Sequence, residues 1–183
     1  MNCRFLVLSL YKTFKGFVMD KIIFLDIDGV LNLRMQSRDR FGSMFHPQFE
    51  SNLKSLIDAT GAKIVVSSSW RFSGLSVMQE MWQSRELAGE VIDITPFTAV
   101  YEADRDSGFL DRCERGCEIR EWMKTHNVDN YVILDDDRDM LEEQLPHFVC
   151  TRDNWEHTDH EEGFGLTKEC TAMAIEILNN NNL

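Results

Sequence analysis

The sequence lacks the features that mark secreted, disulfide-linked or membrane-spanning chains. Its 183 residues contain five cysteines, an odd number, and no CxxC pair, so we expect neither a disulfide framework nor a zinc ribbon. Only three prolines are present, and no apolar run is long enough to cross a membrane. These absences favour a cytoplasmic protein that has no membrane partner.

Positive charge is also scarce. The chain has 19 Lys and Arg residues against 31 Asp and Glu, a formal net charge of -12. Such a chain repels phosphate backbones unless its basic residues gather on one face, so long nucleic acid is not the partner that composition suggests. Apolar residues make up 43% of the chain, enough for one compact core.

Domain organisation follows from that single core. We interpret residues 1 to 18 as an N-terminal extension, either disordered or lying upstream of a start at Met19. Its apolar stretch is too short for a membrane span, and no small-residue cleavage site follows it. Residues 19 to 183 are predicted to form a single domain.

Strands and helices are predicted to alternate along the domain. Short apolar, partly β-branched runs indicate buried strands, and apolar residues at helical spacing indicate amphipathic helices. Alternation of this kind predicts an α/β fold of three layers, a Rossmann-like parallel sheet with helices on both faces, whose ligands bind beyond the carboxyl ends of the strands. Residues 97 to 114 are expected to be irregular. The predicted strands cover residues 21–26, 62–66, 91–94, 131–134 and 148–150, and the predicted helices cover residues 47–60, 75–87, 116–126 and 167–178.

Polar clusters follow three of these strands. Asp26 and Asp28 leave the first strand two residues apart, with Gly29 allowing a sharp turn. Carboxylates crowded together repel one another unless a cation neutralises them, and Mg²⁺ is the oxygen-liganded ion that also bridges to phosphate. Ser67 to Ser69 follow the second strand and Asp135 to Asp137 follow the fourth. The pattern therefore predicts a magnesium site at one edge of the sheet.

The same residue types are suited to phosphoryl transfer. A carboxylate such as Asp26 can act as nucleophile and form an aspartyl phosphate. Asp28 can protonate the leaving oxygen and later deprotonate the attacking water. Serine hydroxyls and amides at the neighbouring strand end can hold the phosphoryl oxygens.

Four segments resemble the motifs of the haloacid dehalogenase-like (HAD) superfamily, in order, over about residues 20 to 150. DIDGV, from Asp26 to Val30, is similar to the first motif, and KIVVSSSWR to the second. Arg115 in ERGCEIREWM resembles the basic third motif, with Lys124 as the less favoured alternative. YVILDDD is similar to the fourth, acidic motif.

The resemblance implies a role for each matched residue. It makes Asp26 and Asp28 the catalytic pair, and Asp26, Asp28 and Asp136 the Mg²⁺ ligands. Asp135 becomes the partner of Arg115, and Asp137 a substitute for either acid. Phosphate binding falls to Arg115 together with Ser68 and Ser69, with Ser67 as an alternative register for the serine.

The closest resemblance is to the HAD domain of RNA-repair (Swiss Army Knife) proteins, carried by SSSWR, RGCEIREWM and VILDDD. It implies a phosphatase whose partner is a phosphorylated small molecule, a nucleotide, or the 3' or 5' end of a nucleic acid. The gap from Asn32 to His46 is too short for a large cap domain. Positive charge for a larger substrate is expected from arginines in and after that gap, at positions 34, 38, 40 and 71.

Other interpretations remain open. A HAD-like domain without activity would bind a phosphorylated ligand or a protein partner. One of the acids at 135 to 137 is expected only to cap the following turn. Trp70, Trp82 and Trp122 are expected in the core rather than at a binding surface.

Overall fold

The computed structural model describes residues 21–33, 37–97, 102–103, 110–111, 114–128, 130–152 and 165–180. The N-terminal extension expected over residues 1 to 18 lies outside this range. No helix within the described residues has the length and apolar character needed to cross a membrane.

A five-stranded parallel sheet organises the chain. Strand β1 is central, between β4 and β8, and both pairings are parallel and in register, so that Leu25 lies level with Val66 and Leu134. β5 and β9 occupy the edges, also in parallel pairings. All of these strands therefore present their carboxyl ends at the same side of the sheet. The bounds are β1 (Ile22–Leu25), β4 (Lys63–Val66), β5 (Val91–Ile94), β8 (Tyr131–Asp135) and β9 (Phe148–Cys150).

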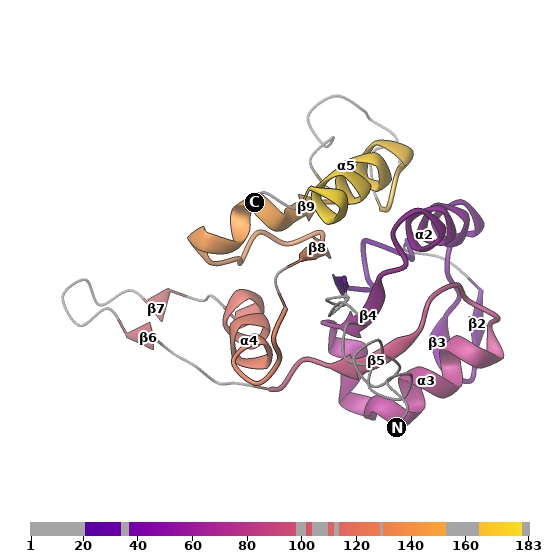
Figure 1. Cartoon of the computed structure of the whole chain (residues 1–183). Coiled ribbons are helices and arrows are strands. Elements are labelled where there is room, and N and C mark those ends of the chain that lie inside the picture. Colours follow the sequence, from indigo (N-terminus) through magenta and orange to yellow (C-terminus); the bar gives the residue numbers. More distant parts are fainter. Residues whose placement is uncertain are drawn as a thin grey trace, which may run out of the picture.

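Helices cover both faces of this sheet (Figure 1). On one face, α2 (Pro47–Thr60), α3 (Leu75–Ser84) and α5 (Lys168–Asn179) pack over Ile23, Leu25 and their neighbours. On the other face, α4 (Glu114–Met123) packs over Ile22 and Phe24 through Ile119 and Trp122. Successive residues of β1 thus point into two separate cores, because side chains alternate along a strand. The predicted α/β class with helices on both faces is confirmed.

Two hairpins and two 3-10 helices complete the described elements. The gap from Asn32 to His46 contains only the short hairpin of β2 (Arg38–Asp39) and β3 (Gly42–Ser43) in its described part, in agreement with the absence of a large cap domain. Residues 97 to 114, expected to be irregular, include a second hairpin, β6 (Glu102–Ala103) with β7 (Leu110–Asp111). Strands of two residues are too short to produce a periodic signal in the sequence. The 3-10 helices are η1 (Ser69–Ser73) and η2 (Glu142–His147).

Candidate active site

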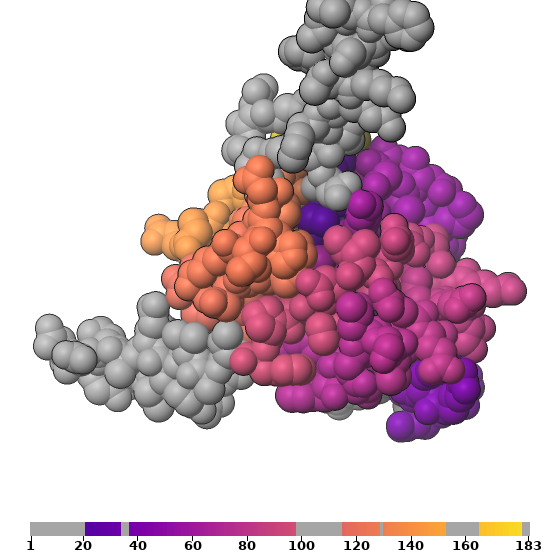
Figure 2. Space-filling view, turned by 60° about the horizontal axis from the view of Figure 1, so that its bottom comes forward, coloured from indigo at the N-terminus to yellow at the C-terminus, as the bar shows by residue number. Residues whose placement is uncertain are grey.

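The carboxyl ends of the three central strands meet around Asp26. The backbone N–H of Asp26 donates to the Leu134 carbonyl at 2.9 Å, and that of Ser67 donates to the Leu25 carbonyl at 2.8 Å. These bonds continue the sheet by one residue past β1 and β4, so the polar clusters start level with one another. In Figure 2 a small indigo area, from residues 21–33, reaches the surface between the orange and magenta parts of the chain.

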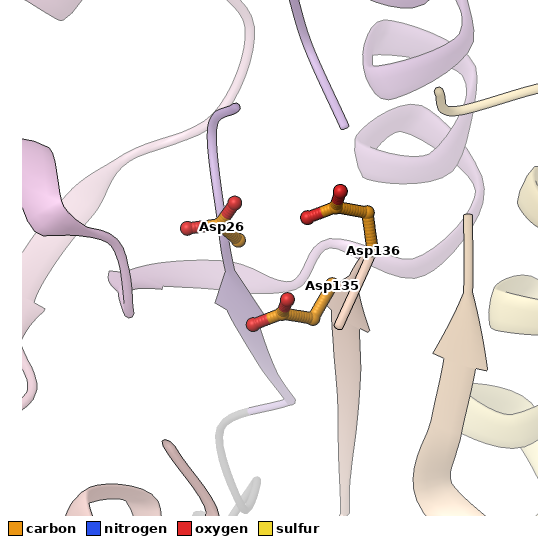
Figure 3. Close-up of side chains that lie close together, drawn as sticks. All are labelled: Asp26, Asp135 and Asp136. Atoms are coloured by element: carbon orange, nitrogen blue, oxygen red, sulfur yellow. The ribbon is translucent and has the colours of Figure 1, made fainter. Parts of the chain in front are cut away.

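Three carboxylates gather at this point. Asp26, Asp135 and Asp136 each place an oxygen within 4.8 Å of the other two, and Figure 3 shows them approaching from two neighbouring strand ends. Burial raises the pKa of Asp26 to about 7, against the lowering effects of Arg115 and of a hydrogen bond from the Ser68 side chain. Burial and the charge of Asp26 raise the pKa of Asp135 to about 8. Burial also raises the pKa of Asp136. Burial thus opposes ionisation of all three carboxyl groups.

Arg115 is a cation paired with the nucleophile candidate, Asp26. It extends from the first turn of α4, where its backbone N–H donates to the Asp139 carboxylate at 3.1 Å. Its Nη2 lies 3.5 Å from Asp26 Oδ1, and its Nε lies 3.1 Å from Asp135 Oδ2. The side chain is 19% exposed, so the guanidinium can still meet a ligand while paired with both acids.

The loop after β1 passes very close to Asp136. Gly29 has a φ of 77°, and a Cβ at this position would lie 2.5 Å from Asp136 Oδ2. Only glycine both adopts this backbone conformation readily and leaves room for the carboxylate. Thr151 fixes the loop from the other side, since its hydroxyl donates to the Gly29 carbonyl at 2.9 Å.

Asp28 lies apart from the three-carboxylate cluster. Its Oδ2 accepts a hydrogen bond from Trp70 Nε1 at 2.9 Å, and its Oδ1 accepts one from the Asn32 side-chain amide at 2.9 Å. Asp28 is an exposed residue. The expected set of ligand carboxylates, Asp26, Asp28 and Asp136, thus differs from the set that the structure brings together, in which Asp135 stands in place of Asp28. Trp70 and Asn32 thus orient the exposed Asp28 carboxylate.

The three serines have different surroundings. Ser68 is fully buried, its side chain hydrogen-bonds to Asp26, and it also caps η1. Ser67 is buried too, but its Oγ accepts from the Thr95 hydroxyl at 3.4 Å. Ser69 is exposed and begins η1. Of the two registers considered for the serine, the structure places Ser68 against the carboxylate.

Asp137 lies outside the carboxylate cluster, and two of the arginines expected to provide charge for a substrate form ion pairs within the chain. The Asp137 side chain is 71% exposed, and its backbone N–H donates to Asp135 Oδ1 at 3.0 Å, so it shapes the turn after β8. Arg71 was expected to supply surface charge, but it is buried at 3% exposure and lies 2.5 Å from the Glu118 carboxylate. Arg40 pairs with Glu80. Arg34 lies outside the described residues.

Several residues at the site were not predicted. Trp70, expected in the core, packs only partly against it and directs its indole N–H to Asp28. Glu118 lies between the guanidinium groups of Arg71 and Arg115, at 2.5 and 3.7 Å. Its position three residues after Arg115 on a helix was a usable signal. Arg152 forms an ion pair with Asp136, and no local pattern indicated it.

The acidic cluster suits a hard divalent cation. Magnesium binds carboxylate oxygens, and it favours their ionised forms where burial opposes them. The Asp135 Oδ2 atom is buried without a hydrogen bond, although Arg115 Nε lies 3.1 Å away. Its charged partner is the Arg115 guanidinium, and the three carboxylates lie close enough together to share one cation. Asp26, Asp135 and Asp136 can therefore hold a metal ion.

Fold and site together define the class of protein. A parallel sheet whose central strands end in an aspartate beside a basic helix residue, a serine and paired acids is the arrangement of HAD-like hydrolases. A family model described as the HAD domain in Swiss Army Knife RNA repair proteins matches residues 22–167, and the chain belongs to this family. A solved structure described as a HAD superfamily (subfamily III A) hydrolase from Legionella pneumophila is 18% identical, with a TM-score of 0.41, over 88% of this chain and 84% of that chain. No curated protein matched the sequence.

Proposed function

We propose that this HAD-family hydrolase is a magnesium-dependent phosphatase that cleaves a phosphate monoester through an aspartyl phosphate on Asp26. The observation that carries the proposal is the placement of one buried carboxylate against Arg115 at 3.5 Å and against the Ser68 side chain. A nucleophile for phosphate needs cationic and hydrogen-bonding groups around the transferred oxygens. Arg115, Ser68 and the exposed Ser69 are the groups proposed to supply them.

The first step transfers the phosphoryl group to the enzyme. An Asp26 oxygen forms a bond to phosphorus, the ester P–O bond breaks, and the leaving oxygen takes a proton from the Asp28 carboxyl. Hydrogen bonds from Trp70 and Asn32, both at 2.9 Å, hold the Asp28 carboxyl group in one position. Positioning matters because the acid must reach the leaving oxygen at hydrogen-bond distance.

The second step restores the enzyme. Asp28, now ionised, takes a proton from a water molecule whose oxygen attacks phosphorus. The bond between phosphorus and the Asp26 oxygen breaks, which returns the Asp26 carboxylate and releases inorganic phosphate. A single residue thus serves as acid and then as base.

Magnesium, when bound, would neutralise the carboxylates and the phosphate oxygens together. Asp26 and Asp136 would hold it. The sequence favours Asp28 as the third ligand residue, whereas Asp135 is the third carboxylate that lies close to them. Arg115 already pairs with Asp135 at 3.1 Å, which supports the interpretation of Asp135 as the partner of Arg115. The Asp137 side chain belongs neither to the cluster of Asp26, Asp135 and Asp136 nor to the ion pair of Asp135 with Arg115.

The substrate class we propose is a nucleotide or a nucleic-acid end. Membership of a family named for RNA repair supports it. The net charge of -12 does not favour wide contact with a phosphate backbone, so the enzyme is expected to act on a terminal phosphate.

Hydrolysis of p-nitrophenyl phosphate by the purified 183-residue chain, with Mg²⁺ or with EDTA, tests the proposal. Asp26→Asn should abolish turnover, and Asp28→Asn should accumulate a phosphorylated protein that intact-mass measurement detects. Asp58→Asn is the matched control, because Asp58 is exposed and pairs with Lys54 on the surface. Turnover by Asp26→Asn at a rate similar to that of the unmodified protein would refute the assignment of the nucleophile. Binding of phosphate without turnover would instead indicate the non-catalytic alternative.

A further inference from the structure

Two phenylalanines form an exposed aromatic stack on the 3-10 helix and loop that border the site. Phe72 lies in η1, three residues after Ser69, and Phe97 lies three residues after the end of β5. Their rings are 4.5 Å apart between centroids and only 9° from parallel. Phe72 is 75% exposed and Phe97 is 50% exposed. Among the described residues no other Phe, Trp or Tyr exposes half of its surface.

A short chain of contacts joins this stack to the proposed nucleophile. The Arg71 guanidinium lies 4.4 Å from the centre of the Phe97 ring. Arg71 also donates from Nη1 to the Ser68 carbonyl at 2.7 Å, and the Ser68 side chain hydrogen-bonds to Asp26. The aromatic pair is thus separated from the reacting carboxylate by two residues, both of them buried.

The pair is held in place although it is exposed. Arg71 is buried, and it is fixed by Glu118 at 2.5 Å and by the Thr95 carbonyl at 3.1 Å. Phe97 packs on this guanidinium, and Phe72 packs on Phe97, so the contacts run in the order Arg71, Phe97, Phe72. A cation against an aromatic ring and a ring against a ring are both favourable arrangements. The outermost ring, Phe72, is left with most of its surface in solvent.

The fold does not account for this exposure. Phe72 and Phe97 belong to neither of the two buried clusters of the described core. Two rings offer far less area than the roughly 800 Å² that each partner of a standard protein complex buries. Their size and flatness match a single planar ring.

We infer that the Phe72–Phe97 stack is a base-stacking subsite, which receives the nucleobase next to the phosphate that Asp26 attacks. The inference rests on the proposed phosphatase function and specifies its substrate as a nucleotide or a nucleic-acid terminus. Stacking on an aromatic ring tolerates any base, because every base has a π face. The subsite would therefore select for the presence of a base rather than for its identity.

A comparison of substrates with and without a base tests the inference. We would measure kcat/KM, with Mg²⁺, for a nucleoside monophosphate, a 3'-phosphorylated dinucleotide and ribose 5-phosphate. Phe72→Ala should lower kcat/KM for the two base-containing substrates by about 5- to 150-fold, the usual loss when one stacked base loses its ring. It should leave ribose 5-phosphate within about twofold of the unmodified enzyme. Phe72→Trp should retain activity, since it keeps an aromatic face.

The matched control is Met173→Ala on α5, which removes an apolar side chain that is 52% exposed and should affect no substrate. Equal kcat/KM for nucleotides in Phe72→Ala and in the unmodified enzyme would overturn the inference and leave the phosphatase proposal intact. So would an equal loss on ribose 5-phosphate, or turnover of p-nitrophenyl phosphate without turnover of any nucleotide. Absence of turnover on every ester would instead remove the proposed function on which the inference rests.

Discussion

Replacing Asp26 with asparagine should stabilise the metal-free protein at neutral pH while it removes activity. Burial raises the pKa of Asp26 from its ordinary value of 3.8 to about 7. A carboxyl whose folded-state pKa is raised favours the folded state most when protonated, so this contribution is complete below about pH 4 and is lost as pH rises to about 7. Asparagine cannot ionise, and it keeps the shape of the side chain.

The magnitude follows from the size of that shift. Each unit of pKa corresponds to about 1.4 kcal/mol, so ionised Asp26 costs the metal-free fold on the order of 4 kcal/mol above pH 7. The advantage of Asp26→Asn in the free energy of unfolding should therefore grow by roughly 1.4 kcal/mol per pH unit between about pH 4 and 7, and then level off. Losing the ion pair between Asp26 and Arg115 would lower the stability of this variant, but Arg115 keeps its ion pairs with Asp135 and Glu118.

Urea denaturation in EDTA at pH 5, 6, 7 and 8 measures this difference. Asp58→Asn serves again as the control, because its exposed carboxylate should give a small difference that does not change with pH. Mg²⁺ should stabilise the unmodified protein at pH 8 and have little effect on Asp26→Asn. If the difference in the free energy of unfolding between Asp26→Asn and the unmodified protein stays constant from pH 5 to 8, the argument is refuted. That argument holds that burial destabilises the ionised form of Asp26 unless a cation neutralises it.

Three further predictions concern the same cluster. The affinity for Mg²⁺, measured by calorimetry, should rise at least about tenfold between pH 6 and 8. The reason is that ionisation of Asp26, with a pKa of about 7, and of Asp135, with a pKa of about 8, precedes binding; an affinity independent of pH would count against the site. Gly29→Ala should abolish Mg²⁺-dependent activity, since its Cβ would meet Asp136, whereas Gly61→Ala, with φ of 66° and nothing within 4 Å, should cost only about 1 kcal/mol of stability and no activity. Arg115→Lys should raise KM for phosphate esters by about tenfold, because a lysine ammonium cannot make the two parallel hydrogen bonds of a planar guanidinium. An unchanged KM would show that Arg115 pairs with Asp135 but does not bind the substrate.

Much of the fold could be predicted because its strands are continuous apolar runs. The predicted strand at residues 91 to 94 agrees with β5 (Val91–Ile94), and the helix from Pro47 ends before Gly61, as its left-handed C-cap requires. Helix α4 (Glu114–Met123) begins two residues earlier than expected, because Arg115 and its neighbours carry no apolar periodicity. The two hairpins could not be predicted, because strands of two residues produce no periodic signal in the sequence.

The sequence predicted the site residues whose chemical type the reaction requires. It did not predict the side-chain orientations that packing with distant residues determines. Sequence places Asp26, Ser68 and Asp135 at adjacent strand ends, and the parallel register brings them together. The direction of the Asp28 side chain depends on Trp70, 42 residues away, and the burial of Arg71 depends on Glu118. Such pairings leave no signal in local spacing.

Helix α4 links the active site to the smaller of the two cores. It carries Arg115 and Glu118 toward the carboxylates, while Ile119 and Trp122 anchor it to the sheet face opposite α2, α3 and α5. Catalytic competence should therefore follow the local stability of this one helix rather than the stability of the whole domain. Brief detachment of α4 would remove the phosphate clamp while the larger core remains folded. On gradual heating, loss of turnover should precede global unfolding.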